Sequence, residues 1–247
     1  MMPFLPVAGS THAAALDAVT QSVHVHMAIQ AVAWGLFFGY VLVRFRRGAQ
    51  RRARHKGLHP LFPTIAIGLV IVGDAIVLAT AALPAWVERS VMPSSHPAPL
   101  EINVVAEQFV WNIHYPGPDH TFGRTSQALI GVANPLGIDR TDANAQDDIG
   151  LLNLLTLPLG RPVIVHLSSR DVIHSFTLNE MRVRQDTVPG IPIRTWFTPV
   201  IVGQWDIACS QLCGVGHYRM RGEYRVLPVR EWEQWLASEL ALLTRSP

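Results

Sequence analysis

Two long apolar runs stand out in the first part of the chain. Residues 23–43 contain no acidic or basic side chain other than His24 and His26, and residues 64–83 contain a single charge, Asp74. About twenty apolar residues are enough to cross a bilayer as a helix. The pattern therefore predicts two transmembrane helices that form a hairpin.

The segments around these runs set the predicted boundaries. We expect an external segment over 1–22, the hairpin over 23–87 and, because prolines recur there, an extended linker over 88–100. No Lys or Arg precedes Arg44, so the first run lacks the positively charged start of a secretory signal. We therefore expect it to be a retained helix.

After residue 100 the pattern changes to short alternating segments. Residues 101–115 alternate apolar and polar positions and predict one strand, and the stretch 120–150, rich in Asp, Asn, Gly and Thr, predicts a long surface loop. Further strand patterns separated by Gly and Pro follow at 162–168, 172–177, 194–199, 204–208 and 222–228. Such spacing indicates an antiparallel sandwich or barrel over 101–228.

The C-terminal segment 229–247 has helical periodicity. Its apolar residues fall on one face of a helix, and they are Trp232, Trp235, Leu236, Leu240 and Leu243. The predicted fold class is therefore an α+β membrane protein, in which a transmembrane hairpin is followed by a β domain and a C-terminal amphipathic helix.

Composition and charge agree with a membrane protein. Hydrophobic residues make up 49% of the 247 residues and charged residues only 15%. The loop 44–59 holds seven of the twenty basic residues and no acid, so the positive-inside rule places it in the cytoplasm and both termini on the other side. The chain from Glu88 onward is net acidic, which argues against nucleic acid as a partner.

Asp74 is unusual because a charge at membrane depth normally faces a protein partner or a polar cavity. We favour a polar contact between packed helices over a proton or ion path. Either interpretation indicates that the hairpin packs against other membrane subunits.

The chemistry of the chain is concentrated in twelve residues. Cys209, Cys213, His217 and Met220 include both cysteines of the protein, and thiolate, thioether and imidazole are ligands that suit copper. Gly214 and Gly216 favour a loop over a helix there. His174, upstream on a neighbouring strand or turn, is the candidate for a further ligand.

Three chemistries compete for these residues. A disulfide between Cys209 and Cys213 would leave His217 and Met220 unexplained, and a closed zinc site would give Met220 no role. Copper can use all five residues, with the thioether as a weak axial ligand. Because a mononuclear blue-copper site normally needs one thiolate, two thiolates fit two copper ions better.

Three segments carry a resemblance to a known family. They are Asp171-Val-Ile-His-Ser-Phe176, Arg182-Val-Arg-Gln-Asp-Thr-Val-Pro-Gly190 and Cys209-Ser-Gln-Leu-Cys-Gly-Val-Gly-His-Tyr-Arg-Met220. With the hairpin, they resemble subunit II of a bacterial cytochrome c oxidase from residue 23 onward. The resemblance implies that the β domain is a cupredoxin-type antiparallel sandwich with a dinuclear copper centre, called CuA.

The resemblance also implies a role for each ligand. Both cysteine thiolates bridge the two copper ions, each histidine binds one copper, and the methionine and one backbone carbonyl are weak axial ligands. In this sequence the implied ligands are His174, Cys209, Gln211 through its carbonyl, Cys213, His217 and Met220.

Two further positions need comment: Gln211 differs from the residue usual in the family, and Trp111 has an alternative interpretation. The family usually has Glu where this chain has Gln211, and that side chain also reaches a magnesium ion at the interface with subunit I; an amide is a weaker ligand for this hard cation. Trp111, in a Gln-x-x-Trp pattern that starts at Gln108, falls where the family has an exposed aromatic through which electrons enter. The alternative for Trp111 is a core tryptophan.

The implied function is that of subunit II in an aa3-type-like cytochrome c oxidase. CuA would accept electrons from cytochrome c or another c-type haem donor and pass them to haem in subunit I, for oxygen reduction coupled to proton pumping. Implied partners are subunits I and III, and the implied location is the bacterial inner membrane, with the CuA domain and both termini on the periplasmic side.

A membrane-anchored copper-binding or assembly module is the alternative function. A quinol oxidase subunit without copper ligands and a nitrous oxide reductase domain are disfavoured by the ligand set and the anchor.

Overall fold

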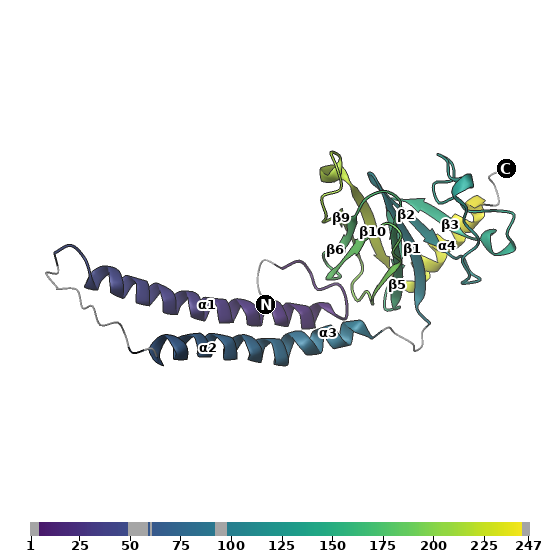
Figure 1. The fold of residues 1–247 in the computed structure, drawn as a ribbon. Helices are drawn as coiled ribbons and strands as arrows, with labels where there is room; N and C mark the ends of the chain where they lie inside the picture. Colours follow the sequence, from purple (N-terminus) through teal and green to yellow (C-terminus); the bar gives the residue numbers. More distant parts are fainter. Residues whose placement is uncertain (1–4, 49–58, 60, 92–97, 244–247) are drawn as a thin grey trace. The chain divides into compact units, whose positions relative to one another are not determined.

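The computed structural model describes residues 5–48, 59, 61–91 and 98–243 (Figure 1). Its contacts divide the chain into two compact units, one with the helices of the hairpin and one with the β domain. The β unit also contains Pro6–Ala14 from the N-terminal end. Most of the predicted basic loop 44–59 and part of the predicted linker 88–100 lie outside the described residues.

The hairpin contains two helical runs that are long and apolar enough to cross a membrane, as predicted. The first is α1 (Ala13–Arg44). The second consists of α2 (Leu61–Val77), a π-helical turn (Leu78–Ala82) and α3 (Leu83–Ser90). Pro84 accounts for the widened turn before it, because proline has no N–H for the preceding turn of helix and its ring crowds that turn.

Helix α1 starts ten residues before the predicted start of the hairpin, so the second half of the predicted external segment 1–22 is helical. Polar residues there lower the hydropathy without ending the helix. The hydroxyl groups of Thr20 and Ser22 donate to the carbonyls of Leu16 and Ala18, one turn earlier, and are satisfied inside the helix.

Two five-stranded sheets form the β domain (Figure 1). Their strand orders are β3-β2-β1-β5-β8 and β4-β10-β9-β6-β7. The strands are β1 (Leu100–Glu107), β2 (Val110–Tyr115), β3 (Ile149–Leu152), β4 (Leu154–Pro158), β5 (Val163–Ser169), β6 (His174–Leu178), β7 (Val183–Thr187), β8 (Ile193–Phe197), β9 (Gly203–Cys209) and β10 (Arg221–Leu227). The predicted β-sandwich is confirmed, but it is mixed rather than antiparallel, because β1 pairs parallel with β5 and β4 pairs parallel with β10.

The predicted strand 101–115 is a hairpin of two strands, β1 and β2, and here the prediction is wrong. Glu107 pairs with Val110 across a two-residue connection, Gln108-Phe109. The inward-facing residues change from even positions in β1 to odd positions in β2, as the pairing of Ala106 with Trp111 shows. A pattern interpreted as one continuous strand misses this change of phase.

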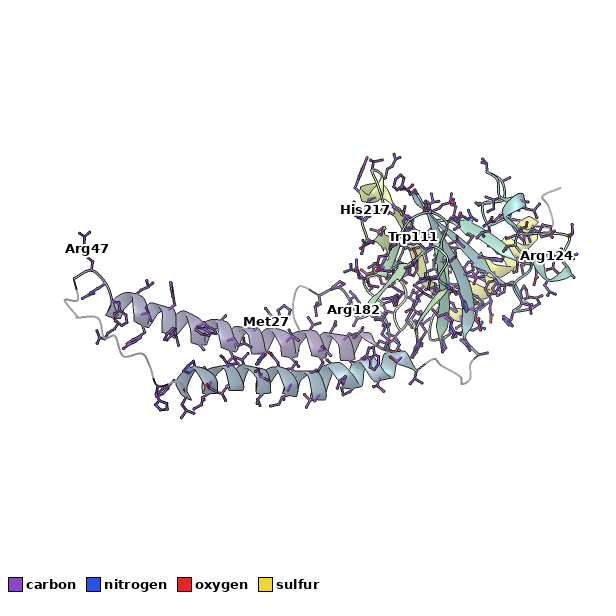
Figure 2. The ribbon with its side chains drawn as sticks, viewed as in Figure 1. Met27, Arg47, Trp111, Arg124, Arg182 and His217 are labelled. Carbon is purple, nitrogen blue, oxygen red and sulfur yellow. The ribbon has the colours of Figure 1, made fainter. Side chains whose placement is uncertain are left out.

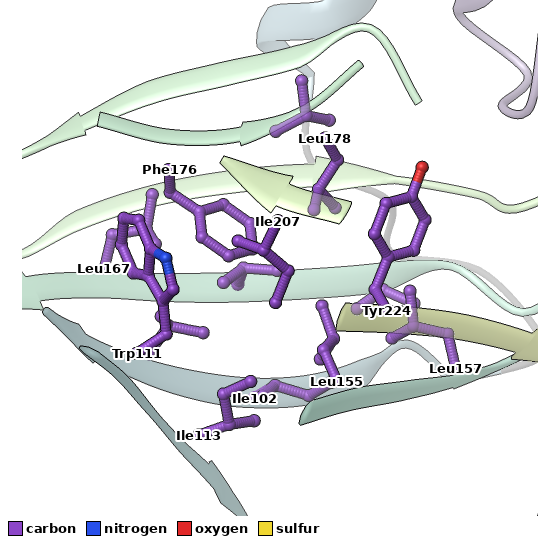
Figure 3. Close-up of a cluster of buried hydrophobic side chains, with 14 of the residues drawn as sticks. Ile102, Trp111, Ile113, Leu155, Leu157, Leu167, Phe176, Leu178, Ile207 and Tyr224 are labelled. Carbon is purple, nitrogen blue, oxygen red and sulfur yellow. The ribbon is translucent and has the colours of Figure 1, made fainter. Parts of the chain in front are cut away.

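The core lies between the two sheets (Figure 3). Alternate residues of β1 and β2 point into it, and so do residues of the facing sheet such as Leu155, Phe176 and Tyr224, all fully buried. Helix α4 (Val229–Leu243) covers one edge of this core with the predicted apolar face, in which Trp232 is buried and the other four residues are partly buried. The C-terminal amphipathic helix is confirmed over its described residues.

The long loop before β3 has little regular structure, as predicted, but it is tied to the sheet. Asn112 and His114 of β2 point away from the core and are nevertheless buried. Asp148 is fully buried; its Oδ2 lies 2.7 Å from Nε2 of His114 and accepts a hydrogen bond from the N–H of Gly123. The loop therefore covers the outer face of β2.

Residues near the N-terminus belong to the β unit. The N–H of Gly9 donates to the carbonyl of Glu180, and the N–H of Val200 donates to the carbonyl of Gly9. Ser10 forms an isolated bridge with Pro199 and is buried. The predicted featureless segment therefore includes an edge contact of the sandwich.

Candidate metal centre

Two connections at one end of the sandwich, from β5 to β6 and from β9 to β10, bring the candidate ligands together. His174 is the first residue of β6, Cys209 is the last residue of β9, and the other ligands lie in the connection from β9 to β10. A bend at Gly214, whose φ of 130° strongly favours glycine, and a single 3-10 turn (His217–Arg219) fold this connection back on itself. The ligands therefore converge from a loop rather than from a helix face, as predicted.

The sulfur and nitrogen atoms lie within a few ångströms of one another. The Sγ atoms of Cys209 and Cys213 are 3.8 Å apart, and Nδ1 of His217 lies 3.6 Å from Sγ of Cys213. Sδ of Met220 lies 3.7 Å from the same sulfur and 3.2 Å from Nδ1 of His174. The ligand atoms of His174 and the two cysteines all fall within 4.8 Å of one another.

The backbone carbonyl of Gln211 belongs to the same group. Its oxygen lies 3.2 Å from Sγ of Cys209, while its side chain is exposed. The geometry thus brings the carbonyl to the cluster. A magnesium role for the amide side chain remains a prediction.

The two cysteines do not form a disulfide. An S–S bond is about 2.05 Å long, whereas these sulfurs are 3.8 Å apart and both thiols are free. The donor set also fits zinc poorly, because zinc has no use for a thioether and Met220 lies among the donors. Two thiolates, two imidazoles, a thioether and a carbonyl fit copper.

Asp171 orients the buried imidazole of His174. Its Oδ1 lies 2.8 Å from Nε2 of His174, so Nε2 carries the hydrogen and Nδ1 is left to face the sulfur cluster. Partial burial raises the pKa of Asp171, but hydrogen bonds from His174 and from the N–H of Gln108 outweigh it and leave the pKa below its usual value. Asp171 is therefore ionised at neutral pH.

Cys213 needs a cation to be a thiolate. Burial, and after it the neighbouring sulfur of Cys209, raises the pKa of the Cys213 thiol to about 12. Two thiolates at this spacing repel each other in a partly dry site, and bound metal cations relieve that repulsion. In the copper-free chain Cys213 is therefore a neutral thiol, and a bound metal has to displace its proton.

Trp111 is not exposed, so the expectation of a surface aromatic at this position is wrong. Its side chain is 0% exposed and lies within the β domain (Figure 2). It packs edge-on against Phe176 (Figure 3). It also packs edge-on against His174, at a ring-centroid distance of 6.2 Å. The alternative of a core tryptophan agrees with this position. The hairpin between β1 and β2 accounts for the burial, because Trp111 pairs with Ala106 and both side chains lie in the core.

The structure draws attention to two residues that the sequence did not single out as part of the site. The side chain of Gln108 donates to the carbonyl of Cys213 at 2.6 Å. Phe109 is partly buried and lies so close to Gly214 and Gly216 that a Cβ on Gly216 would come within 2.5 Å of its ring. The sequence feature that could have indicated this contact is the pair Gly214 and Gly216, because glycines leave room for the ring of Phe109.

The fold and the site together define a class of protein, namely a membrane-anchored β-sandwich with a thiolate–imidazole–thioether metal site at one end. A family model described as cytochrome c oxidase subunit II, periplasmic domain, matches residues 100–223. The chain belongs to this family and is a subunit of a haem-copper cytochrome c oxidase, an oxidoreductase complex.

Individual relatives agree with the family model. An alternative cytochrome c oxidase subunit 2 of Bradyrhizobium diazoefficiens is 32% identical over 206 residues, which cover 83% of this chain and 73% of that protein. Subunit 2 of Cereibacter sphaeroides is 28% identical, covering 70% of this chain and 59% of that protein. The crystal structure of the periplasmic domain of cytochrome oxidase subunit II (CoxB) of Bradyrhizobium japonicum is similar, with 26% identity, a TM-score of 0.45, and coverage of 62% of this chain and 99% of that chain.

Proposed function

We propose that this chain is the electron-accepting subunit of its oxidase and holds a dinuclear CuA centre. Cys209 and Cys213 would hold the copper ions through their thiolates, and His174 and His217 through their imidazoles. Met220 and the carbonyl of Gln211 would be the weaker ligands. When bound, two coppers that share two thiolates accept and release one electron with little rearrangement of their ligands.

The convergence of five side chains and one carbonyl on a single point carries this proposal. The protein's own contribution is to hold those donors in place before the metal arrives. Asp171 fixes the tautomer of His174, and Gln108 ties the loop at Cys213 to the turn between β1 and β2. Burial of Cys213, Met220 and His174 keeps water from the donors.

The proposed electron route runs from a c-type haem donor, through this centre, to haem in subunit I. Oxygen reduction coupled to proton pumping, as in an aa3-type oxidase, would take place in that partner, with subunit III a further member. The corresponding location is the bacterial inner membrane, with the β domain and both termini on the periplasmic side.

We propose that the c-type haem donor docks on the exposed apolar side chains of residues 209–220, which we call the metal loop. Leu212, Val215 and Tyr218 are 77%, 93% and 80% exposed, and Phe109 lies beside them against the loop glycines. Within the fully described ligand segments 171–174 and 209–220, the only carboxylate is Asp171, which is engaged with His174. Apolar docking of this kind predicts that turnover at low donor concentration changes little with salt.

The decisive experiment is metal analysis and EPR spectroscopy of the full-length chain in detergent after loading with copper. We expect two coppers per chain, a purple colour and a mixed-valence signal. Cys213→Ser is the matched control and should lose the mixed-valence signal. A single copper, or zinc in preference to copper, would refute the dinuclear centre and favour a different metal-binding role.

A further inference from the structure

The hairpin contains an acid at membrane depth that the copper chemistry does not use. Asp74 lies on α2, thirteen residues after Leu61, which corresponds to about 20 Å along the helix axis. Its side chain is 63% exposed, although the residues around it on the helix are apolar. A carboxylate in this position requires partners, since water is absent from the hydrocarbon core.

The hairpin supplies one contact from its other helix. Oδ1 of Asp74 lies 2.9 Å from Nε2 of His26 on α1. The imidazole reaches this position over Gly73, where a Cβ would come within 2.3 Å of Cε1 of the ring. Glycine at 73 therefore allows His26 to lie beside the acid.

This contact leaves most of the carboxylate unsatisfied. Nε2 of His26 is also 2.7 Å from the amide nitrogen of Gln30, and one ring nitrogen offers either one hydrogen or one lone pair. Asp74 thus receives at most one hydrogen, at Oδ1, from the hairpin. Its Oδ2 has no partner among the described residues, whereas an ionised carboxylate accepts about four hydrogen bonds.

Positively charged side chains are also scarce around Asp74. No Lys or Arg occurs in the apolar runs 23–43 and 64–83, and His26 is the one base in contact with Asp74 in the described hairpin. We propose that Asp74, positioned by His26, is a contact between this chain and a neighbouring transmembrane helix of the oxidase, and that the partner side chain is a cationic N–H donor, Lys or Arg. The proposal depends on membership in the complex and not on the copper centre.

The test uses the whole oxidase, purified in mild detergent through a tag on this chain. Asp74→Asn keeps the size of the side chain but removes its charge, and Asp74→Leu also removes its hydrogen bonding. The matched control is Glu88→Gln, which removes an exposed acid near the end of the same helical run. The measurement is the ratio of retained membrane subunits to tagged chain, at low and at high salt, with copper content as the check on folding.

We expect Asp74→Asn to reduce the apparent affinity for the neighbouring subunits by about threefold to twentyfold, and Asp74→Leu by at least as much. The loss should be the same at both salt concentrations, because a pair in the hydrocarbon region is not screened. Copper content and the Glu88→Gln variant should match the parent. Unchanged retention in both Asp74 variants would overturn the proposal. A loss that affects only the association of this chain with itself would also overturn the proposal. The same holds for a loss of retained subunits that disappears when the salt concentration is changed.

Discussion

Two strand histidines are each held by an aspartate, His174 of β6 at the metal centre and His114 of β2 under the long loop before β3, and the two pairs serve different ends. Nε2 of His174 lies 2.8 Å from Asp171, and Nε2 of His114 lies 2.7 Å from Asp148. Asp171 is 30% exposed by its side chain, while Asp148 is fully buried.

The surroundings of the second ring nitrogen and of the carboxylate explain the difference. Nδ1 of His174 faces the sulfur of Met220, so its pair orients a ligand. Asp148 instead also accepts from the N–H of Gly123, and Phe122 packs edge-on against the ring of His114. One pair therefore prepares a site, and the other fastens a loop to a sheet. The same two side chains acquire their role from what lies next to them.

Breaking the buried pair of His114 and Asp148 should have the largest effect on stability. Asp148→Ala leaves His114 and the N–H of Gly123 without their partner in a dry environment, and we expect the free energy of unfolding to fall by about 3 kcal/mol. Chemical denaturation of the copper-free chain measures this. Asp186→Asn, at an exposed strand position, is the control and should change stability by less than about 0.5 kcal/mol. An equal loss of unfolding free energy in both variants would contradict a structural role for the His114–Asp148 pair.

Asp171→Asn should affect metal rather than stability. Loss of the carboxylate frees the ring of His174 to rotate or change tautomer, so we expect copper affinity to fall about tenfold to a hundredfold. Competition with a chelator measures the affinity, and denaturation of the copper-free chain should show a much smaller change than for Asp148→Ala. A large loss of stability with unchanged affinity would reverse the roles of the two pairs.

A smaller effect is expected from Met220→Leu, which removes the thioether and nearly preserves side-chain volume. The weak axial ligand contributes little to affinity, so two coppers should remain, with affinity reduced less than about tenfold. The reduction potential and the EPR spectrum should change. Loss of all copper would show that the thioether is a principal ligand instead.

The smallest effect concerns the long loop at low pH. A hydrogen bond from the side chain of Thr141, followed by one from Arg124, lowers the pKa of Asp139 to about 2. Because the folded pKa is depressed, the stabilisation is present above the unfolded pKa and is lost as pH falls from about 4 toward about 2. Hydrogen exchange of the loop amides should report loosening in this window, and Asp139→Asn should abolish the pH dependence.

Local patterns predicted the hairpin, the sandwich, the C-terminal helix and the convergence of the metal ligands. Hydropathy was sufficient for the hairpin, and sulfur and imidazole at short spacing were sufficient for a metal loop. The parallel pairing of β1 with β5 could not be read from alternation, since the period of two is the same in parallel and antiparallel strands. The sequence left Trp111 open between an exposed aromatic and a core residue, and the choice depends on its pairing with Ala106 across the turn at Gln108-Phe109.

Contacts between distant parts of the sequence were the least predictable. Asp148 is followed by a strand that pairs with β2, but nothing in the loop composition indicates that its carboxylate meets His114. Similarly, the small, neutral residues around Ser10 carry no strand pattern. Their hydrogen bonds are made with residues about 170 positions later in the chain, as in the bond from Ser10 to the carbonyl of Met181.

That last contact makes the membrane hairpin an insertion within the β domain. Residues 6–14 are synthesised before both membrane helices, and their partners around Met181 and Pro199 are synthesised after them. The sandwich therefore cannot close its edge until nearly the whole chain is made, and membrane insertion comes before the final folding step. A soluble fragment cut after the hairpin would lack this edge, and reconnecting residues 6–14 through a short linker would restore it.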